Sequence, residues 1–435
     1  MSRGRRLGTR VTAALESVGR WVTPERARVY PLTVVICLLL AGLVAPALGP
    51  SLGFSEAPLA GGDFAAFYTA GHAVSHHHAE VLTDLAQQER YQRELLERPH
   101  QSKWSPWVSP PLLAYAFSPL ADLPFAVAAA LELSLLALAL ALALAWLRRD
   151  LPGLPSSAKL FFYALAFFPL FASLLYQQLT ALFLLALVGM LHSLRERQAI
   201  RAGLWLGVFA VKPQLALGLG LYLLFQKRFL AAGVALGVAC AFFGASYLIL
   251  PDATSRWLLH APALFAYLRQ GGYPTWGQFG ALGSAALLFD ALSPSLATGV
   301  GVMFTLGLVV ALWRLAASPP SAAGPLAAAL ALALCLSPHL YVYDLGLLMV
   351  PFALLYSAGL HQRDDVRGAL ALVYVFCFAG TFLSMVEVDW TREAFGHGTA
   401  LQLGVLAILL AAWASASGGE EARAQASSTT AVAGS

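Results

Sequence analysis

Long apolar stretches separated by short polar breaks run along almost the whole chain. Several approach or exceed the roughly 18 to 20 residues that cross a bilayer core. We place helices at 31–48, 124–147, 159–175, 179–194, 200–212, 214–226, 229–250, 295–316, 323–337, 343–360, 368–386 and 398–414. The pattern therefore predicts an all-α polytopic membrane protein with about twelve transmembrane helices over residues 31–414. A basic stretch (1–30) precedes them, and the tail (415–435), rich in Ala, Ser and Gly, is expected to be disordered.

The composition supports a membrane protein. Apolar residues make up 59% of the chain and charged residues 11%, against about 25% charged in soluble domains. A mean hydropathy of +0.69 excludes a water-soluble enzyme and an intrinsically disordered chain. The four cysteines lie far apart inside apolar segments without C-x-x-C spacing, so we interpret them as packed small hydrophobes.

The distribution of Lys and Arg predicts the orientation in the membrane. With the N-terminus inside, most of the 27 basic residues fall on the cytoplasmic side, and both termini are expected there. The first outer loop is then long, spanning residues 50–123. Within it, the apolar segment from Ser109 to Leu120 is too short to span, and we expect a half-embedded helix at the outer surface. Trp104 and Trp107 are expected at the headgroup level.

Polar residues that could take part in catalysis gather at the predicted outer face. Asp63 opens the first outer loop, and the outer breaks between later helices contribute Gln177, Gln178, Lys212, His339, Tyr343 and Asp344. A carboxylate, a lysine and a histidine at a membrane surface suit transfer chemistry on an anionic lipid. Asp63 would act as general base for an acceptor hydroxyl. Lys212 and His339 would neutralise charge on a leaving phosphate.

Each of these residues also has a purely structural interpretation. Asp63 could cap a helix, Lys212 could extend its ammonium to the interface, and His339 could simply start a helix. The glutamine pair 177–178 could hydrogen-bond neighbouring helices.

Three further polar features have no assigned chemistry. The histidines His72 and 76–78 lack the spacing of a defined metal site and favour a solvated loop. Glu132 and Asp290 fall in apolar surroundings, and the pattern gives neither a role.

Four segments, in order, resemble motifs of glycosyltransferase family 87. DFAAFYTAG at 63–71 looks like its D-F-x-x-Y-x-A-G stretch, and SPPLL at 109–113 like its Y-P-P-L-x segment. GLWLGVFAVKPQ at 203–214 is similar to G-x-x-x-G-x-x-x-x-x-K-P, and SPHLYVYD at 337–344 to S-P-H-x-x-x-Y-D. The chain departs from the family where YQQ (176–178) replaces a G-Q pair, and where Thr69 follows Tyr68 in place of a second aromatic.

The resemblance implies a GT-C enzyme that transfers one sugar from a polyprenyl-monophosphate donor, with inversion, outside the bacterial cytoplasmic membrane. Mannose is the best-known donor sugar, and a glycolipid or glycan hydroxyl is the expected acceptor. It implies Asp63 as catalytic base, with His339 and Lys212 near the donor phosphate. Tyr68, Gln177, Gln178, Tyr343 and Asp344 are expected in the pocket. We expect no metal, no cofactor and no nucleic-acid partner.

Two other functions remain open. A transporter or flippase would also have many helices and polar breaks near the middle of the membrane. A ligase or polymerase of lipid-linked glycans would share the polyprenyl donor, although such proteins typically carry their catalytic loop late in the chain.

Overall fold

A computed structural model describes residues 3–48, 62–97, 104–259, 275–319 and 321–417. The α-helices are α1 Arg3–Trp21, α2 Pro24–Leu48, α3 Phe64–Ser75, α4 Leu85–Leu95, α5 Ala114–Ala121, α6 Phe125–Asp150, α7 Ser157–Ala166, α8 Phe168–Leu175, α9 Thr180–Arg195, α10 Ala199–Gly207, α11 Pro213–Phe225, α12 Phe229–Ile249, α14 Ala281–Phe289, α15 Pro294–Ala316, α16 Ala323–Cys335, α17 Met349–Ser357 and α18 Asp364–Phe395. Helices also cover residues 251–259 and Leu403–Ser417.

Short 3-10 helices join several of these elements: η2 Ala79–Thr83, η3 Pro111–Leu113, η4 Val208–Val211, η5 Thr275–Gly277, η6 Val342–Leu348 and η7 Leu360–Gln362. Within the described ranges the only β-structure is an isolated antiparallel bridge between Gln278 and Tyr341. The all-helical prediction is therefore confirmed for the part of the chain that the structure describes.

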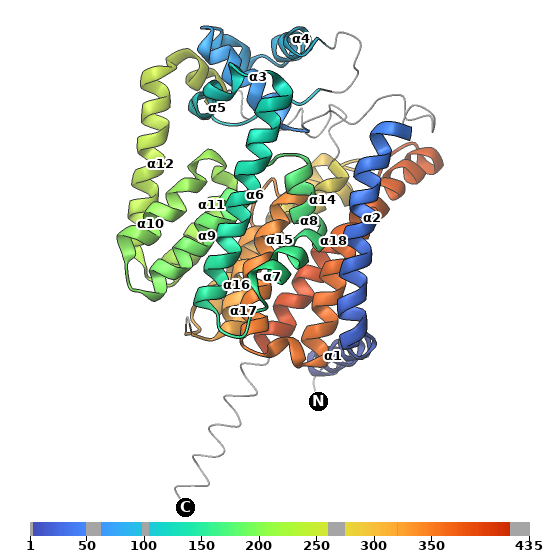
Figure 1. Cartoon of the computed structure of the whole chain (residues 1–435). Helices are drawn as coiled ribbons and strands as arrows, with labels where there is room; N and C mark the ends of the chain where they lie inside the picture. The colour runs from blue at the N-terminus through green and yellow to red at the C-terminus, as the bar shows by residue number, and fades with distance from the viewer. Residues whose placement is uncertain (1–2, 49–61, 98–103, 260–274, 320, 418–435) are drawn as a thin grey trace, which may run out of the picture.

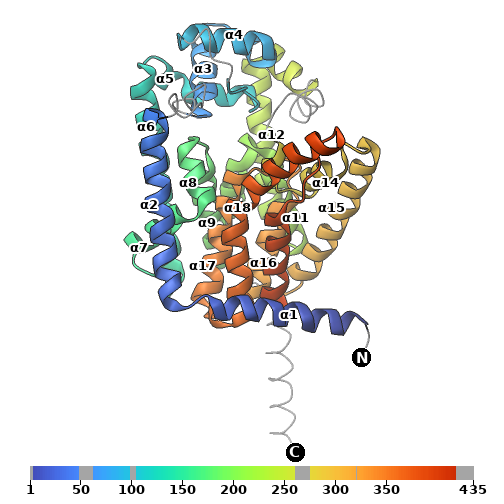
Figure 2. The same ribbon diagram turned by 90° about the vertical axis from the view of Figure 1, so that its right-hand side faces the viewer.

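The molecule consists of a helix bundle with a smaller helical cap at one end (Figure 1). The cap comprises α3, η2, α4, η3 and α5, all from the predicted first outer loop. Helix α6 leads from the cap down the bundle, and the far end of α12 also reaches it (Figure 1). At the opposite end, α1 lies across the base of the bundle (Figure 2). Arg367 at the start of α18 holds α1 there by donating to the Gly19 carbonyl at 2.8 Å.

Every predicted apolar helix has a helical counterpart. Among the described residues, four helices (α6, α12, α15 and α18) are long and apolar enough to cross a membrane, or five if the bent α7–α8 pair forms one span. In the same described ranges, seven further apolar helical segments of 10–17 residues are shorter than a full span. The chain is thus a polytopic membrane protein, and the number twelve stays a prediction.

The helix expected over 159–175 is two helices, because α7 and α8 meet at an angle of 83°. Phe167 adopts an extended conformation between them, and Pro169 lies in the first turn of α8. Proline fits a first helical turn but would disrupt the interior of a continuous helix. The bend places the end of α8 and the turn that follows it beneath the cap.

The ends of the chain also differ from the expectation. Residues 1–30 were expected only as a basic extension, whereas Arg3–Trp21 forms α1 and α2 already begins at Pro24. The last helix continues to Ser417, past the expected start of the tail at 415, and residues 418–435 lie outside the described part. Amphipathic and polar helices such as α1 are stabilised mainly by packing against the rest of the protein. A search for long apolar runs therefore does not find them.

The short helix expected at 109–120 is present as η3 and α5, packed against α3, and its half-embedded position at the outer surface stays a prediction. Phe67 of α3 stacks on Phe117 of α5 with ring centroids 4.7 Å apart. Trp107 is only 4% exposed and its ring meets Phe67 edge-on at 5.7 Å, while its expected level at the headgroups stays a prediction. Trp107 therefore belongs to the core that holds the cap together.

A close helix–helix approach fixes the bundle beneath the cap. A Cβ on Gly218 of α11 would lie 1.9 Å from the Ala333 carbonyl oxygen of α16, so only glycine fits there. Two residues further along α11, a Cβ on Gly220 would meet nothing within 4 Å. This approach aligns the start of α11 with the turn that follows α16.

We predict that Gly218→Ala destabilises the protein by about 1–3 kcal/mol, because the added methyl group overpacks the α11–α16 contact. Gly220→Ala is the matched control and should leave stability unchanged or slightly raised, since alanine is the better helix former by about 0.5–1 kcal/mol. Thermal unfolding in detergent measures both. Equal melting temperatures for the two variants would contradict this packing.

Candidate active site

The Asp63 carboxylate is held by side chains from the cap and from the bundle. Asp63 occupies the N-cap position of α3, but its side chain makes no capping hydrogen bond. Instead, Ser105 Oγ donates to one carboxylate oxygen at 2.9 Å, and Gln178 Nε2 donates to the other at 2.5 Å. Helix capping is therefore not what this carboxylate does.

The backbone around Asp63 is fixed against the turn after α8. The Asp63 amide donates to the Tyr176 carbonyl at 3.0 Å. Gly62 has a φ of +49°, and a Cβ there would lie 2.7 Å from the Tyr176 Cα. Glycine is favoured where a positive φ and close backbone contact coincide. The cap and the bundle consequently meet at this point.

The glutamine pair is divided between two roles. Gln178 lines the cavity beside Asp63, whereas Gln177 is buried and lies outside it. Gln177 has a φ of +52°, in the left-handed region that glycine adopts without strain. This explains why glycine suits the position in the motif that the chain resembles. Here glutamine adopts the same backbone conformation.

Lys212 and Asp344 form a buried ion pair behind the cavity. Lys212 Nζ donates to Asp344 Oδ1 at 2.6 Å and lies 4.9 Å from the centre of the Tyr343 ring. The other Asp344 oxygen accepts the Tyr341 amide at 3.2 Å. Asp344 has no exposed surface, while the Lys212 side chain keeps 16% and lines the cavity. Asp344 therefore contacts Lys212 rather than the cavity.

His339 lies in the turn between α16 and η6. The Gln278 amide donates to His339 Nδ1 at 2.8 Å, and the bridge between Gln278 and Tyr341 holds the two segments together. Burial, together with the positive charge of Lys212, lowers the pKa of His339 to about 3. The imidazole is thus neutral at physiological pH. In the neutral form its Nε2–H can act as a donor, and the expected role of His339 beside the donor phosphate stays a prediction.

A cavity of about 110 Å³ separates the cap from the bundle and collects these groups. The cap contributes Asp63 and Ser105, and the bundle contributes Gln178, Lys212, His339 and Tyr343. Burial raises the pKa of Asp63, while hydrogen bonds from Gln178 and Ser105 and the charge of Lys212 act in the opposite direction. The site therefore places a carboxylate and an ammonium group at one cavity, from opposite sides of the cap–bundle junction.

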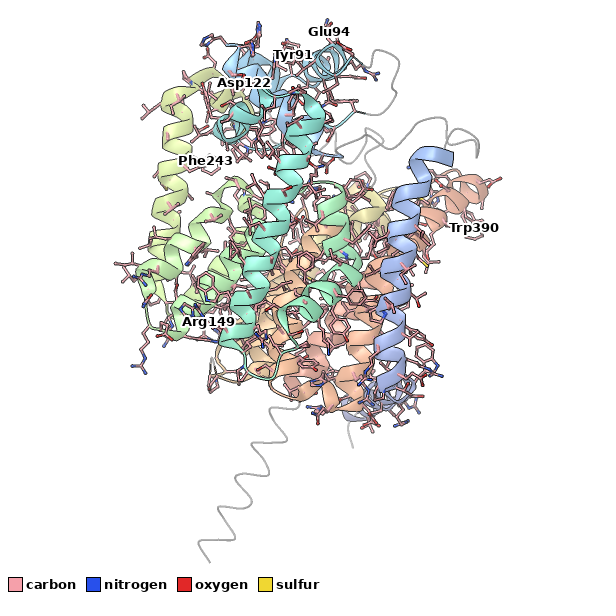
Figure 3. All side chains as sticks on the ribbon, viewed as in Figure 1. Tyr91, Glu94, Asp122, Arg149, Phe243 and Trp390 are labelled. Carbon is pink, nitrogen blue, oxygen red and sulfur yellow. The ribbon has the colours of Figure 1, made fainter. Side chains whose placement is uncertain are left out.

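Two groups from the sequence analysis lie away from the cavity. The Tyr68 hydroxyl donates to the Leu123 carbonyl at 2.8 Å, which ties α3 to the start of α6. His72 contacts the Tyr91 hydroxyl at 2.9 Å on the cap, where Figure 3 labels Tyr91, and residues 76–78 are exposed. Within the described ranges, no group of three or more His, Cys, Asp or Glu residues could hold a metal ion.

Sequence reasoning missed three residues that support the site. Ser105 binds Asp63, Gln278 binds His339, and Trp257 donates to the Val108 carbonyl at 3.2 Å across the cavity wall. Ser105 lies just before the SPPLL motif, so a search of the residues around that motif could have found it. No local pattern marks Gln278 or Trp257, because only the tertiary fold brings them to the site.

Comparison with known proteins identifies the family. The family model for glycosyltransferase family 87 matches residues 107–338, which is more than half of the chain. The chain belongs to glycosyltransferase family 87. The match includes Gln178 and Lys212, whereas Asp63 and His339 lie beyond its ends. No curated protein and no solved structure matches the chain.

We predict that Asp344→Asn destabilises the protein by about 3–5 kcal/mol, because it leaves the Lys212 ammonium buried without its counter-charge. The double variant Lys212→Met/Asp344→Asn removes both charges and keeps an oxygen for the Tyr341 amide. It should regain most of the lost stability but not sugar transfer. Thermal unfolding and a transfer assay separate these outcomes, and a double variant as unstable as Asp344→Asn would argue against the pair.

Proposed function

We propose that this family 87 glycosyltransferase moves one sugar from a polyprenyl-monophosphate donor to a hydroxyl of a glycolipid or glycan. The observation that carries the proposal is the Asp63 carboxylate facing the same cavity as the Lys212 ammonium. A carboxylate suits deprotonation of the acceptor, and an ammonium suits an anionic leaving group. Mannose is the donor sugar we favour, from the family resemblance.

The proposed reaction is a single displacement with inversion. The acceptor oxygen attacks the anomeric carbon, and its proton passes to the Asp63 carboxylate. The bond between the anomeric carbon and the phosphate oxygen breaks, and polyprenyl monophosphate leaves with the bonding electron pair. The reaction needs no oxidant or reductant. The enzyme itself accepts only the proton of the acceptor hydroxyl.

Lys212 is the group best placed to meet the charge that develops on the leaving phosphate. One of its three N–H donors is committed to Asp344, which orients the ammonium. A fixed, partly buried donor stabilises developing charge more than a mobile exposed one, because the reaction does not have to reorganise it. His339 would add a neutral hydrogen bond rather than a second charge.

The apolar helices support a donor that stays in the membrane. A polyprenyl chain cannot leave the bilayer, so its phosphate must be met at the surface where the cavity lies between cap and bundle. We propose that this surface is the outer face of the bacterial cytoplasmic membrane, with both termini on the inner side. The concentration of basic residues away from the cap supports that orientation.

We predict that Asp63→Asn lowers turnover by about 10²–10⁴-fold, the range for loss of a general base, and leaves donor binding intact. The assay uses purified protein in nanodiscs, with polyprenyl-phosphate-mannose, a membrane-lipid extract and product detection by mass spectrometry. Gln177→Asn, outside the cavity, is the control for a conservative change nearby. Near-wild-type turnover by Asp63→Asn would remove Asp63 as the base.

We also predict that Gln178→Ala moves the acid limb of the kcat/KM profile to higher pH. The Gln178 hydrogen bond favours ionised Asp63, so its loss raises the already elevated pKa of the carboxylate further. Transfer requires the ionised form, and activity is therefore lost at a higher pH as the solution is acidified. A reduced rate with an unmoved acid limb would show that Gln178 acts on something other than Asp63.

A further inference from the structure

A second polar cavity lies at the end of the bundle opposite the cap. Its volume is about 50 Å³, and its walls come from the ends of α9 and α11, the start of α16 and the residue preceding α12. The polar side chains in its lining are Arg195, Tyr222, Gln226 and Arg228. This is the end of the molecule at which Figure 3 labels Arg149.

The two arginines of this cavity have no acidic partner. No carboxylate lines it, and within the described part of the chain neither Arg195 nor Arg228 forms an ion pair. Arg195 donates only a long hydrogen bond of 3.4 Å, to the Asp150 carbonyl. The Asp150 carboxylate is instead engaged by His192 at 2.7 Å. Arg195 is exposed and Arg228 is half-buried, so the cavity mouth carries two positive charges without a carboxylate partner.

A tyrosine hydroxyl opens onto the same cavity. Tyr222 is 4% exposed and lines the cavity, and its hydroxyl has no hydrogen-bond partner among the described residues. Gln226 is differently placed, because its Nε2 donates to the Ala316 carbonyl at 2.5 Å and closes the cavity on the α15 side. A cavity-lining hydroxyl without a protein partner can donate a hydrogen bond to a ligand or to ordered water. With two guanidinium groups in the same lining, the ligand that fits is an anion with acceptor oxygens.

We propose that this cavity binds the phosphate of an anionic phospholipid in the leaflet on that side. Basic pockets between transmembrane helices are typical sites for such headgroups. A lipid is favoured over free phosphate because α12 begins directly after Arg228 and exposes Phe229 (64%) and Leu230 (59%). Only 11% of the apolar window of α12 is buried, which leaves a flank along which acyl chains can lie.

The proposal differs from general attraction of basic loops to an anionic membrane. Arg197 and Lys227 lie in the same two turns as the cavity arginines but do not line it. Removing these two charges changes the net charge of this end by the same amount. The pairs Arg195/Arg228 and Arg197/Lys227 are therefore matched for charge and differ in contact with the cavity.

Native mass spectrometry of the purified full chain in detergent tests the proposal, with phosphatidylglycerol titrated against phosphatidylcholine. Wild type should retain one phosphatidylglycerol in preference. Arg195→Gln/Arg228→Gln should lower that retention by about tenfold or more, as expected for loss of charge-assisted hydrogen bonds. Arg197→Gln/Lys227→Gln should stay within about twofold of wild type.

A second variant covers the case in which the double arginine variant fails to fold. Tyr222→Phe keeps the ring and removes only the hydroxyl, and it should reduce retention by several-fold while preserving the melting temperature. Equal loss in both charge-matched variants would overturn the proposal in favour of diffuse attraction. Displacement of the lipid by millimolar inorganic phosphate would assign the site to a free anion instead.

Discussion

The ion pair between Lys212 and Asp344 is the constraint on which the site depends. An ammonium group within an apolar bundle is costly unless a counter-charge lies beside it. Asp344 supplies that charge from a fully buried position and is itself fixed by the Tyr341 amide. The pair joins the start of α11 to η6, so the segments that carry Lys212, His339 and Tyr343 cannot shift independently.

The cap completes the site from the other side. Asp63 is useful only if its carboxylate faces the Lys212 side of the junction, and the Tyr176 carbonyl fixes its backbone there. Ser105 from the cap and Gln178 from the bundle then hold the two oxygens separately. A change in how the cap sits on the bundle would alter the orientation of Asp63, the proposed base, so the position of the cap would affect the proposed reaction.

Interrupted helices place polar groups inside the otherwise apolar bundle. The bend between α7 and α8, the end of η4 at Lys212 and the turn carrying His339 all interrupt apolar helices beneath the cap. Irregular backbone at membrane depth is tolerated where it lines a cavity or is buried in protein. The polar breaks in the sequence therefore supply residues that line the cavity in the structure.

The sequence by itself determined the positions of the apolar helical segments and the residues available for chemistry, because apolar runs and their polar breaks are local properties of the chain. It identified Asp63, Gln178 and Lys212 as neighbours of a single face. The tertiary structure alone decided that Asp344 supports Lys212, that Tyr68 belongs to the core and that burial lowers the pKa of His339. Partners such as Ser105 and Gln278 are distant in sequence, and burial and hydrogen bonding depend on which segments meet in space.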